Sequence, residues 1–285
     1  MKGQRSALPL GPALAAGVAL AMLTACASVD RSGTADSLAR PAGMTRSLVQ
    51  TSTFVLTAFS RQRDPAAPLV VYIEGDGLAW VSRTEPSKDP TTRTPVALTL
   101  AVLDPAPNVL YLARPCQYTP ADRDRRCGNS EYWTSRRFAE EVIAAANQAI
   151  DQSLRAGGRG VRLVGFSGGG AVAALVAARR TDVIDLRTVA GNLDHVTLHR
   201  IHGVSQLRGS LNAADVAAQL AALPQLHLVG GRDKTIVPQV VESYANRAAD
   251  RRCIEVKRVE SASHEDGWPE VWPATLRTAP ACRRS

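Results

Sequence analysis

One serine occupies a position in which its hydroxyl could act as a nucleophile. It is the centre of the pentapeptide Gly165-Phe166-Ser167-Gly168-Gly169, which follows a β-branched run and precedes an apolar run rich in alanine and valine. A serine raised on a sharp strand-to-helix turn needs small residues two positions before and after it, because these approach neighbouring backbone closely. Both positions are glycine. No Lys-Ser or Lys-Thr pair follows, so a phosphate-binding loop is disfavoured.

This motif, in its strand-to-helix context, resembles the nucleophile turn of the α/β-hydrolase superfamily, whose chain order is serine, then an acid, then histidine. The run 226–229 leads into a Gly-x-x-Asp turn ending at Asp233, and the run 254–259 leads to His264. The resemblance implies that Ser167 is the nucleophile, that His264 takes its proton, and that Asp233 orients the imidazole. The resemblance covers most of the chain between residues 54 and 280.

A second aspartate and the other histidines are alternatives. Asp194 follows the run 186–190, where some members of the superfamily carry the acid, so it stays a candidate. His227 lies inside an apolar run and is expected to be buried. The remaining histidines precede the proposed acid and are expected to be structural or to line the pocket; they are His195, His199 and His202.

An oxyanion needs backbone N–H donors, and two regions could supply them. One donor is expected from Gly168, the residue after the nucleophile. The other is expected from the loop after the run 69–73, which reads Glu74-Gly75-Asp76-Gly77. We assign it to the Asp76 N–H, with Gly77 as the alternative. The superfamily usually has His-Gly here; a glutamate in place of the histidine opposes an oxyanion unless its carboxylate points away or is neutralised.

Alternating strands and helices must position these residues. Short apolar runs predict strands, most of them buried on both faces, at 54–59, 69–73, 109–113, 161–165, 186–190, 226–229 and 254–259. Helical patterns occupy 134–154, 168–180 and 237–249, and Trp268 and Trp272 are expected to pack in a helix after His264. The sequence predicts one α/β domain over residues 51–285, an α/β-hydrolase fold with a mostly parallel sheet covered by helices on both faces.

Three connections are expected to shape the substrate pocket. The segments 78–92 and 114–133 contain Trp80, Tyr118, Tyr132 and Trp133. The third segment, 192–224, lies where this superfamily often inserts a cap, but it is short, so little or no lid is expected.

The first 25 residues have the pattern of an export signal. Lys2 and Arg5 precede an apolar stretch that is shorter than a typical transmembrane helix. The stretch ends in Leu23-Thr24-Ala25-Cys26. This tetrapeptide resembles a bacterial lipobox, which implies cleavage before Cys26 and attachment of acyl chains there. Residues 26–50 are predicted to form a flexible lipidated tether. We expect the protein to face the periplasm, on the outer membrane rather than the inner one.

The cysteines and the overall composition favour an exported, folded protein that does not bind nucleic acid. Four further cysteines favour two disulfides, of which Cys116–Cys127 with Cys253–Cys282 is the most local pairing. Hydrophobic residues make up 45% and charged residues 21%, which excludes wholesale disorder. The net charge of +8 is spread along the chain without a dense basic run, so no nucleic-acid partner is expected.

The sequence therefore predicts a lipid-anchored serine hydrolase that acts on an ester or thioester of a small-molecule or lipid-like acyl substrate, without metal or organic cofactor. Two alternatives remain open. One is a catalytically idle lipoprotein that binds an envelope partner, and the other is an acyltransferase that uses the same three residues.

Overall fold

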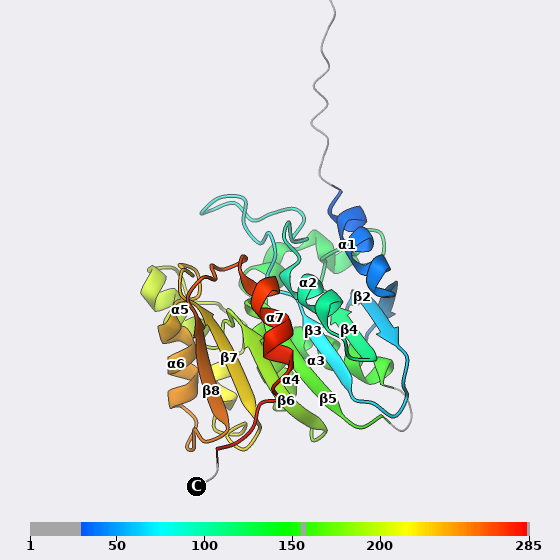
Figure 1. Cartoon of the computed structure of the whole chain (residues 1–285). Coiled ribbons are helices and arrows are strands. Elements are labelled where there is room, and N and C mark those ends of the chain that lie inside the picture. The colour runs from blue at the N-terminus through cyan, green and yellow to red at the C-terminus, as the bar shows by residue number, and fades with distance from the viewer. Residues whose placement is uncertain (1–29, 155–157, 284–285) are drawn as a thin grey trace, which may run out of the picture. The chain divides into compact units, whose positions relative to one another are not determined.

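The computed structural model describes residues 30–154 and 158–283, and in these residues eight strands form a single sheet (Figure 1). The strand order is β1-β2-β4-β3-β5-β6-β7-β8. The six strands from β4 to β8 in this order are parallel, whereas β1 and β2 run antiparallel at one edge. The strands are β1 (Thr45–Gln50), β2 (Val55–Gln62), β3 (Leu69–Ile73), β4 (Asn108–Leu112), β5 (Val161–Phe166), β6 (Val183–Val189), β7 (Gln225–Gly230) and β8 (Ile254–Val259).

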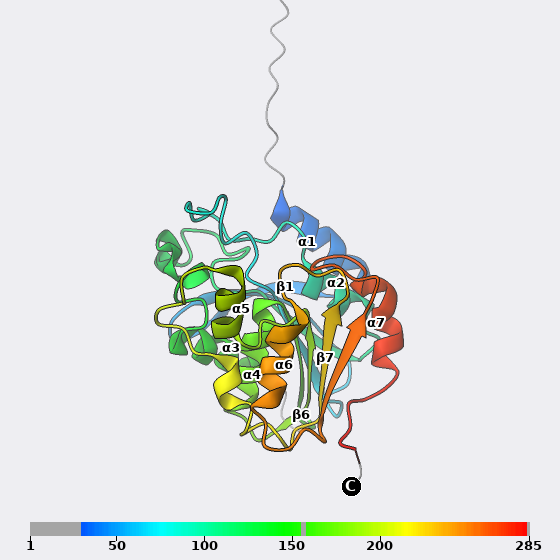
Figure 2. The same cartoon turned by 90° about the vertical axis from the view of Figure 1, so that its left-hand side faces the viewer.

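Helices cover both faces of the sheet (Figures 1 and 2). One face carries α1 (Arg31–Ala39), α2 (Val96–Leu103) and α7 (Trp268–Leu276). The other face carries α3 (Glu140–Ser153), α4 (Gly168–Ala177), α5 (His195–His202) and α6 (Pro238–Asn246). Short 3-10 helices lie at Arg40–Ala42, Arg125–Gly128, Ser130–Trp133 and Ala213–Val216. Within the described residues, no helix has the length and apolar character needed to cross a membrane.

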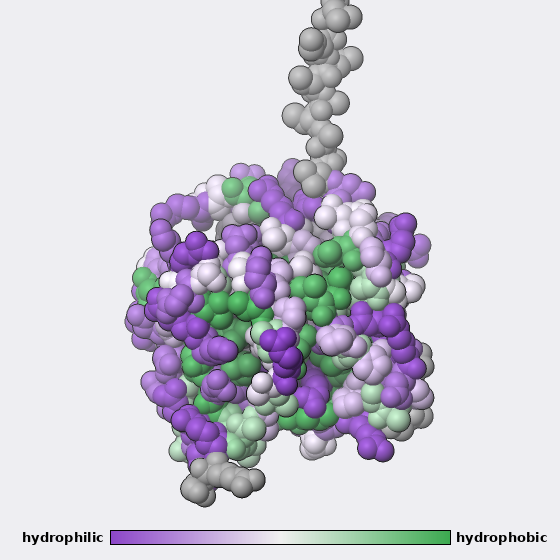
Figure 3. Space-filling model, in the orientation of Figure 1, coloured by the Kyte–Doolittle hydropathy of each residue, from purple (hydrophilic) through white to green (hydrophobic). Residues whose placement is uncertain are grey.

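The central strands divide the hydrophobic core into two layers. In β3, Val71 and Ile73 face α3 and α4, whereas Tyr72 faces α2 and α7. The Trp272 indole N–H donates to the Tyr72 hydroxyl at 3.1 Å, so the second layer is joined by polar contacts as well as by packing. On the molecular face with α2 and α7, hydrophobic residues gather in patches bordered by hydrophilic ones (Figure 3). Strands buried on both faces explain why their sequences are continuously apolar.

The prediction of a flexible tether up to residue 50 is wrong for residues 31–50. Residues 31–39 form α1, in which Ala35 and Ala39 are buried against the layer containing α2, and β1 pairs with β2 along its whole length. The domain therefore begins at Arg31 rather than at residue 51. The predicted signal peptide and Cys26 lie outside the described residues.

The remaining elements differ from the sequence prediction mainly in their bounds. All seven predicted strands are present, and β1 is an additional one. The helix predicted from residue 134 begins at Glu140, because the Arg136 N–H donates to the Glu131 carbonyl within a series of turns. The helices α2 and α5 had no predicted counterpart. The expected helix containing Trp268 and Trp272 is present as α7, and both indoles are buried.

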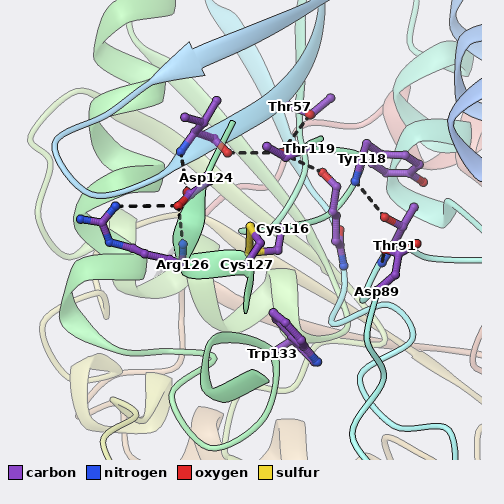
Figure 4. Close-up of a disulfide and its surroundings, with 12 residues drawn as sticks. Thr57, Asp89, Thr91, Cys116, Tyr118, Thr119, Asp124, Arg126, Cys127 and Trp133 are labelled. Carbon is purple, nitrogen blue, oxygen red and sulfur yellow. Dashed lines mark hydrogen bonds and ion pairs between the residues drawn. A yellow bond between two sulfur atoms is a disulfide. The ribbon is translucent and has the colours of Figure 1, made fainter. Parts of the chain in front are cut away.

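Both predicted disulfide pairings are formed. Cys116 and Cys127 have Cα atoms 5.3 Å apart, and Cys253 and Cys282 have Cα atoms 3.9 Å apart. The first disulfide packs against Trp133, beside a turn that Asp124 organises by accepting the Arg126 N–H (Figure 4). It thereby fixes the connection after β4 close to the carboxyl edge of the sheet.

Candidate active site

Ser167 lies on a strained turn between β5 and α4. Its backbone has φ +50° and ψ −121°, a conformation that L-residues rarely adopt. The flanking glycines make the turn possible: a Cβ on Gly165 would lie 2.3 Å from the Gly169 carbonyl oxygen, and one on Gly169 would lie 2.2 Å from that of Ile73. The tightness of this turn is what projects the serine above the sheet.

The structure brings Ser167, His264 and Asp233 together. His264 Nε2 lies 3.1 Å from Ser167 Oγ, and His264 Nδ1 lies 2.9 Å from Asp233 Oδ2. An ionised carboxylate only accepts, so it favours the imidazole tautomer with hydrogen on Nδ1. Nε2 then carries a lone pair directed at the serine hydroxyl. This arrangement can remove a proton from Ser167 while the carboxylate stabilises the resulting imidazolium.

The acid is fixed and the base is accessible. Asp233 Oδ1 accepts the N–H groups of Thr235 and Ile236 at 2.7 and 2.9 Å, and its side chain is fully buried. The His264 side chain is 21% exposed and its ring centre lies 5.3 Å from that of Phe166. The Trp268 indole N–H donates to the His264 carbonyl at 2.9 Å, so α7 holds the loop that carries the base.

The alternative acid, Asp194, has a different set of partners. It caps α5 by accepting the Thr197 N–H and hydroxyl at 3.1 and 2.8 Å, and it also accepts from Asn212 and Ser243 at 2.9 and 2.6 Å. These contacts join α5, α6 and the intervening loop. The structure therefore gives Asp194 the contacts of a structural carboxylate and gives Asp233 the contact with His264.

The other histidines lie elsewhere. His227 is buried as expected, bonded to Thr188 Oγ1 at 2.8 Å and to Gln225 Oε1 at 3.1 Å, and burial lowers its pKa to about 3. It is therefore neutral near pH 7. The histidines of α5 belong to a separate group, in which the His195 ring stacks with Phe138 at 5.9 Å.

Two of the predicted oxyanion donors, Asp76 and Gly77, line the same cleft as Ser167, and the third, Gly168, directly follows Ser167. Among the described residues, the backbone N–H groups of Asp76, Gly77 and Gly168 have no hydrogen-bond acceptor. The loop after β3 and the start of α4 are in close contact, since a Cβ on Gly168 would lie 2.0 Å from Asp76 Oδ1. These donors are thus available to a negatively charged oxygen, and both Asp76 and Gly77 remain candidates for the second one.

Two arginines neutralise the Asp76 carboxylate. Arg114 Nη1 lies 3.0 Å from Asp76 Oδ1, and Arg137 Nη1 lies 2.7 Å from Asp76 Oδ2. Burial alone would raise the pKa of the Asp76 carboxyl, but the two guanidinium groups outweigh it and hold that pKa below its ordinary value. Arg114 also bonds to the Arg137 carbonyl and lies over the Phe138 ring. Sequence reasoning missed both arginines, because no local pattern marks them.

The Glu74 carboxylate is bonded to groups of its own loop, of α2 and of β4. Its buried carboxylate accepts the Gly75 N–H at 2.9 Å, the Ala97 N–H at the start of α2 at 3.3 Å, and the Tyr111 hydroxyl at 3.2 Å. Burial raises the pKa of Glu74 to about 7, although these donors favour the charged form. The departure from the His-Gly pattern thus creates a link between the oxyanion loop and α2.

A cleft of about 320 Å³ opens over these residues. Of the three connections expected to shape a pocket, the segment 78–92 contributes Ala79, Trp80 and Thr92 to its wall. Tyr118 and Trp133 are buried instead. The complete lining is Glu74, Gly75, Asp76, Gly77, Ala79, Trp80, Thr92, Arg137, Phe166, Ser167, Thr235, His264 and Glu265. Within the described residues, no group of histidine, cysteine, aspartate and glutamate side chains is arranged to hold a metal ion.

Solved structures share this architecture at low sequence identity. An esterase from Pyrococcus furiosus is similar with a TM-score of 0.59 and 11% identity over 84% of this chain and 91% of its own. Est1E from Butyrivibrio proteoclasticus, solved with ferulic acid, has a TM-score of 0.60 and 12% identity over 81% of this chain and 96% of its own.

The acylaminoacyl peptidase of Pyrococcus horikoshii has a TM-score of 0.60 and 9% identity over 85% of this chain and 42% of its own. No protein-family model and no curated protein matches this chain. The similarities show that the chain has the α/β-hydrolase fold, as the sequence predicted.

Proposed function

We propose that this protein is a lipid-anchored serine hydrolase that cleaves a carboxylic ester or thioester. The observation that carries the proposal is the pair of contacts of His264, 3.1 Å to Ser167 Oγ and 2.9 Å to Asp233 Oδ2. Motif order in the sequence and the strained backbone of Ser167 support the same assignment independently.

The reaction begins with attack of Ser167 Oγ on the acyl carbon while His264 Nε2 takes the hydroxyl proton. The carbonyl oxygen becomes negative, and the N–H groups of Gly168 and of Asp76 or Gly77 stabilise it. The intermediate collapses by breaking the bond to the alcohol or thiol, which leaves with the proton from His264. Water then attacks the acyl-enzyme by the same route and releases the acid.

The choice of an ester or thioester rests on the superfamily resemblance and on the esterases among the similar structures. Alcohols and thiols are better leaving groups than amines, so they place the smallest demand on the acid that protonates them. No residue of α5 or of the short segment after it lines the cleft, so a substrate can enter without movement of a large lid.

The anchor is proposed from the lipobox-like sequence before Cys26. The two disulfides support export into an oxidising compartment. The protein would then face the periplasm, with the outer membrane as the proposed location. Its acylated cysteine would hold it at the surface stably, because more than one acyl chain is attached.

A fluorophosphonate probe tests the proposed chemistry directly, since it reacts with an activated serine. We expect labelling of the wild-type protein and none of Ser167→Ala, with Ser205→Ala as a control because Ser205 is exposed and lies outside the cleft. Failure of folded wild-type protein to react would instead support an idle lipoprotein. An acceptor alcohol that outcompetes water in product analysis would identify an acyltransferase.

A further inference from the structure

The first helix of the domain starts beside the wall of the cleft. The Arg31 guanidinium pairs with the Asp89 carboxylate at 3.0 Å and donates to the Thr91 carbonyl oxygen. The next residue, Thr92, lines the cleft. Figures 1 and 2 show the start of α1 at the same end of the molecule as the carboxyl ends of the parallel strands. The chain therefore enters the domain next to a segment that forms part of the cleft wall.

Residues 78–90, which we call the 78–90 hairpin, form an ordered projection at this end. The Leu78 N–H donates to the Pro90 carbonyl at 3.0 Å, and the Val81 N–H donates to the Glu85 carbonyl at 2.9 Å. The Trp133 indole donates to the Ser87 carbonyl at 3.0 Å, so the base of the hairpin is attached to the region of the first disulfide. The projection is thus held in one orientation relative to the cleft.

Apolar and charged side chains, more of them basic than acidic, occupy the exposed part of this hairpin and the residues next to it. Trp80 is 42% exposed and Val81 is 52% exposed, although both are residues that usually avoid water. The exposed cations nearby are Arg83, Lys88 and Arg93. The exposed acid Glu85 lies among them, whereas Asp89 is paired with Arg31. In Figure 3 the upper edge of the molecule shows a small hydrophobic group with a hydrophilic border. Tryptophan with lysine or arginine is the combination that favours the boundary between a bilayer and water.

The length of chain before the domain limits how far it can lie from an anchor. Only four residues separate Cys26 from Arg31. A fully extended chain covers at most about 3.5 Å per residue, so the Cα atoms of these two residues are no more than roughly 18 Å apart. An anchored Cys26 therefore keeps the start of α1, and with it the 78–90 hairpin, near the lipid surface.

We propose that the 78–90 hairpin docks on the phospholipid surface that holds the anchor, with Trp80 and Val81 in the interfacial layer. This proposal rests on the anchor and the activity proposed above. Docking turns the mouth of the cleft toward the bilayer, because Trp80 is both an exposed residue of the hairpin and a part of the cleft wall. The substrate class that this geometry serves is an acyl ester with its alkyl chain in the membrane.

Tryptophan fluorescence tests the docking, because the other three tryptophans are buried. Trp133, Trp268 and Trp272 are 4% exposed or less. The full-length lipidated protein is reconstituted in vesicles of anionic and neutral phospholipid, with and without lipids brominated near the headgroup. We expect bromine quenching of the wild-type emission and none in Trp80→Phe.

A matched variant controls for nonspecific quenching. Leu103 is 39% exposed and ends α2 just before β4 begins, so it lies at the opposite edge of the sheet. Leu103→Trp in the Trp80→Phe background supplies an exposed tryptophan away from the proposed surface, and we expect it to remain unquenched. Absence of quenching in the wild type, or equal quenching of both positions, overturns the proposal.

A second measurement tests whether docking speeds the hydrolysis of a substrate that is embedded in the membrane. Val81 does not line the cleft. Moving one valine from the interface into water changes partitioning by roughly tenfold or more, so we expect Val81→Asp to slow hydrolysis of a vesicle-embedded long-chain ester about tenfold. Hydrolysis of a water-soluble short ester stays unchanged, as do both rates in Leu103→Asp. Equal rates of wild type and Val81→Asp on the embedded ester contradict the proposal.

The two proposals fail in different ways. A wild-type protein that hydrolyses neither ester loses the proposed activity, and the quenching measurement then decides the docking alone. A protein that hydrolyses the soluble ester while Trp80 is unquenched keeps the activity and loses the docking.

Discussion

Asp76 and Glu74 show how two carboxylates next to a proposed oxyanion hole are made compatible with it. Asp76 is held as an anion by Arg114 and Arg137, whose positive charges offset the negative charge of its carboxylate beside the cleft. Glu74 is turned toward α2 and the Tyr111 hydroxyl, and its pKa is raised to about 7 by burial. The Asp76 carboxylate is neutralised by ion pairs, and the Glu74 carboxylate is bonded to α2 and to Tyr111. Nothing in the local sequence distinguishes these two outcomes.

The sequence located the proposed triad because its members are tied to local patterns. Ser167 lies between two glycines at a strand-to-helix turn, and Asp233 and His264 follow strands with clear apolar runs. Arg114 and Arg137 escaped prediction because their role depends on a contact between segments far apart in the chain. A chain with many arginines offers no means of selecting these two without the fold.

Replacement of Asp233 tests whether its contact with His264 Nδ1 is needed for catalysis. Asp233→Asn preserves shape but lets the side-chain amide face Nδ1, which favours the wrong imidazole tautomer. We expect kcat on a soluble ester to fall by about 10⁴. Steady-state kinetics measures the effect, with circular dichroism to establish folding.

Asp194→Asn is the matched comparison. It weakens the cap of α5 and its contacts with Ser243 and Asn212, so we expect lower stability with kcat retained by the folded protein. If Asp194→Asn abolished kcat while Asp233→Asn did not, the assignment of the acid would be reversed.

The buried Glu74 carboxyl makes the stability of the folded protein depend on pH. Its pKa is about 7 in the folded state against 4.5 ordinarily, so the folded state binds the proton more tightly. The resulting stabilisation is fully present below about pH 4.5 and is lost as pH rises to about 7. At 1.36 kcal/mol per pKa unit, it amounts to about 3 kcal/mol.

The variant Glu74→Gln removes this titration while keeping a side chain of the same shape. Urea unfolding of both proteins between pH 4.5 and 8 measures the difference in the free energy of unfolding. We expect the wild type to lose stability relative to Glu74→Gln as pH rises. A constant difference across that range would show that the pKa of Glu74 is not raised in the folded state.

At the scale of elements, the carboxyl edge of the sheet depends on contacts between connections rather than on any one of them. The loop after β3 meets the start of α4, the connection after β4 carries Arg114, and the turns before α3 carry Arg137. Sequence periodicity predicted a helix through those turns. The backbone there forms turns instead, in which the Arg136 N–H donates to the Glu131 carbonyl, and these turns place Arg137 against Asp76.

Breaking this contact is expected to impair catalysis more than folding. Arg137→Gln leaves Asp76 with one guanidinium partner, which strengthens the field of its carboxylate on the oxyanion and loosens the donor loop. We expect kcat to fall by roughly 10²-fold, the effect of losing one oxyanion donor. Arg137→Lys should recover part of kcat, because it restores the charge but not the geometry of the guanidinium.

Kinetics on a soluble ester, with the thermal midpoint measured alongside, separates this role from a structural one. A loss of stability that accounts for the whole loss of activity would contradict it. So would equal kcat values of Arg137→Gln and the wild type.

At the scale of the whole molecule, the largest difference from the sequence prediction is where the domain begins. Residues 31–50 are polar and lack periodicity, so local preference does not identify them as structured. Their structure comes from tertiary contacts. Arg61 donates to the Ala42 carbonyl, Met44 is buried, and β1 pairs with β2 in register from end to end. Such contacts override weak local preference.

This boundary predicts that a chain beginning at residue 51 is much less stable than one beginning at residue 30. Removal of α1 and β1 exposes the apolar surface of the domain against which Ala35, Ala39 and Met44 are now buried. We expect the loss of this apolar burial to lower the free energy of unfolding by about 3–5 kcal/mol. For a domain of this size, that lowers the thermal midpoint by roughly 10 °C. Differential scanning calorimetry of the two chains measures it. Equal midpoints would mean that residues 31–50 rest on the domain without stabilising it, and the cleft wall held by Arg31 would then be independent of the chain that leads to the anchor.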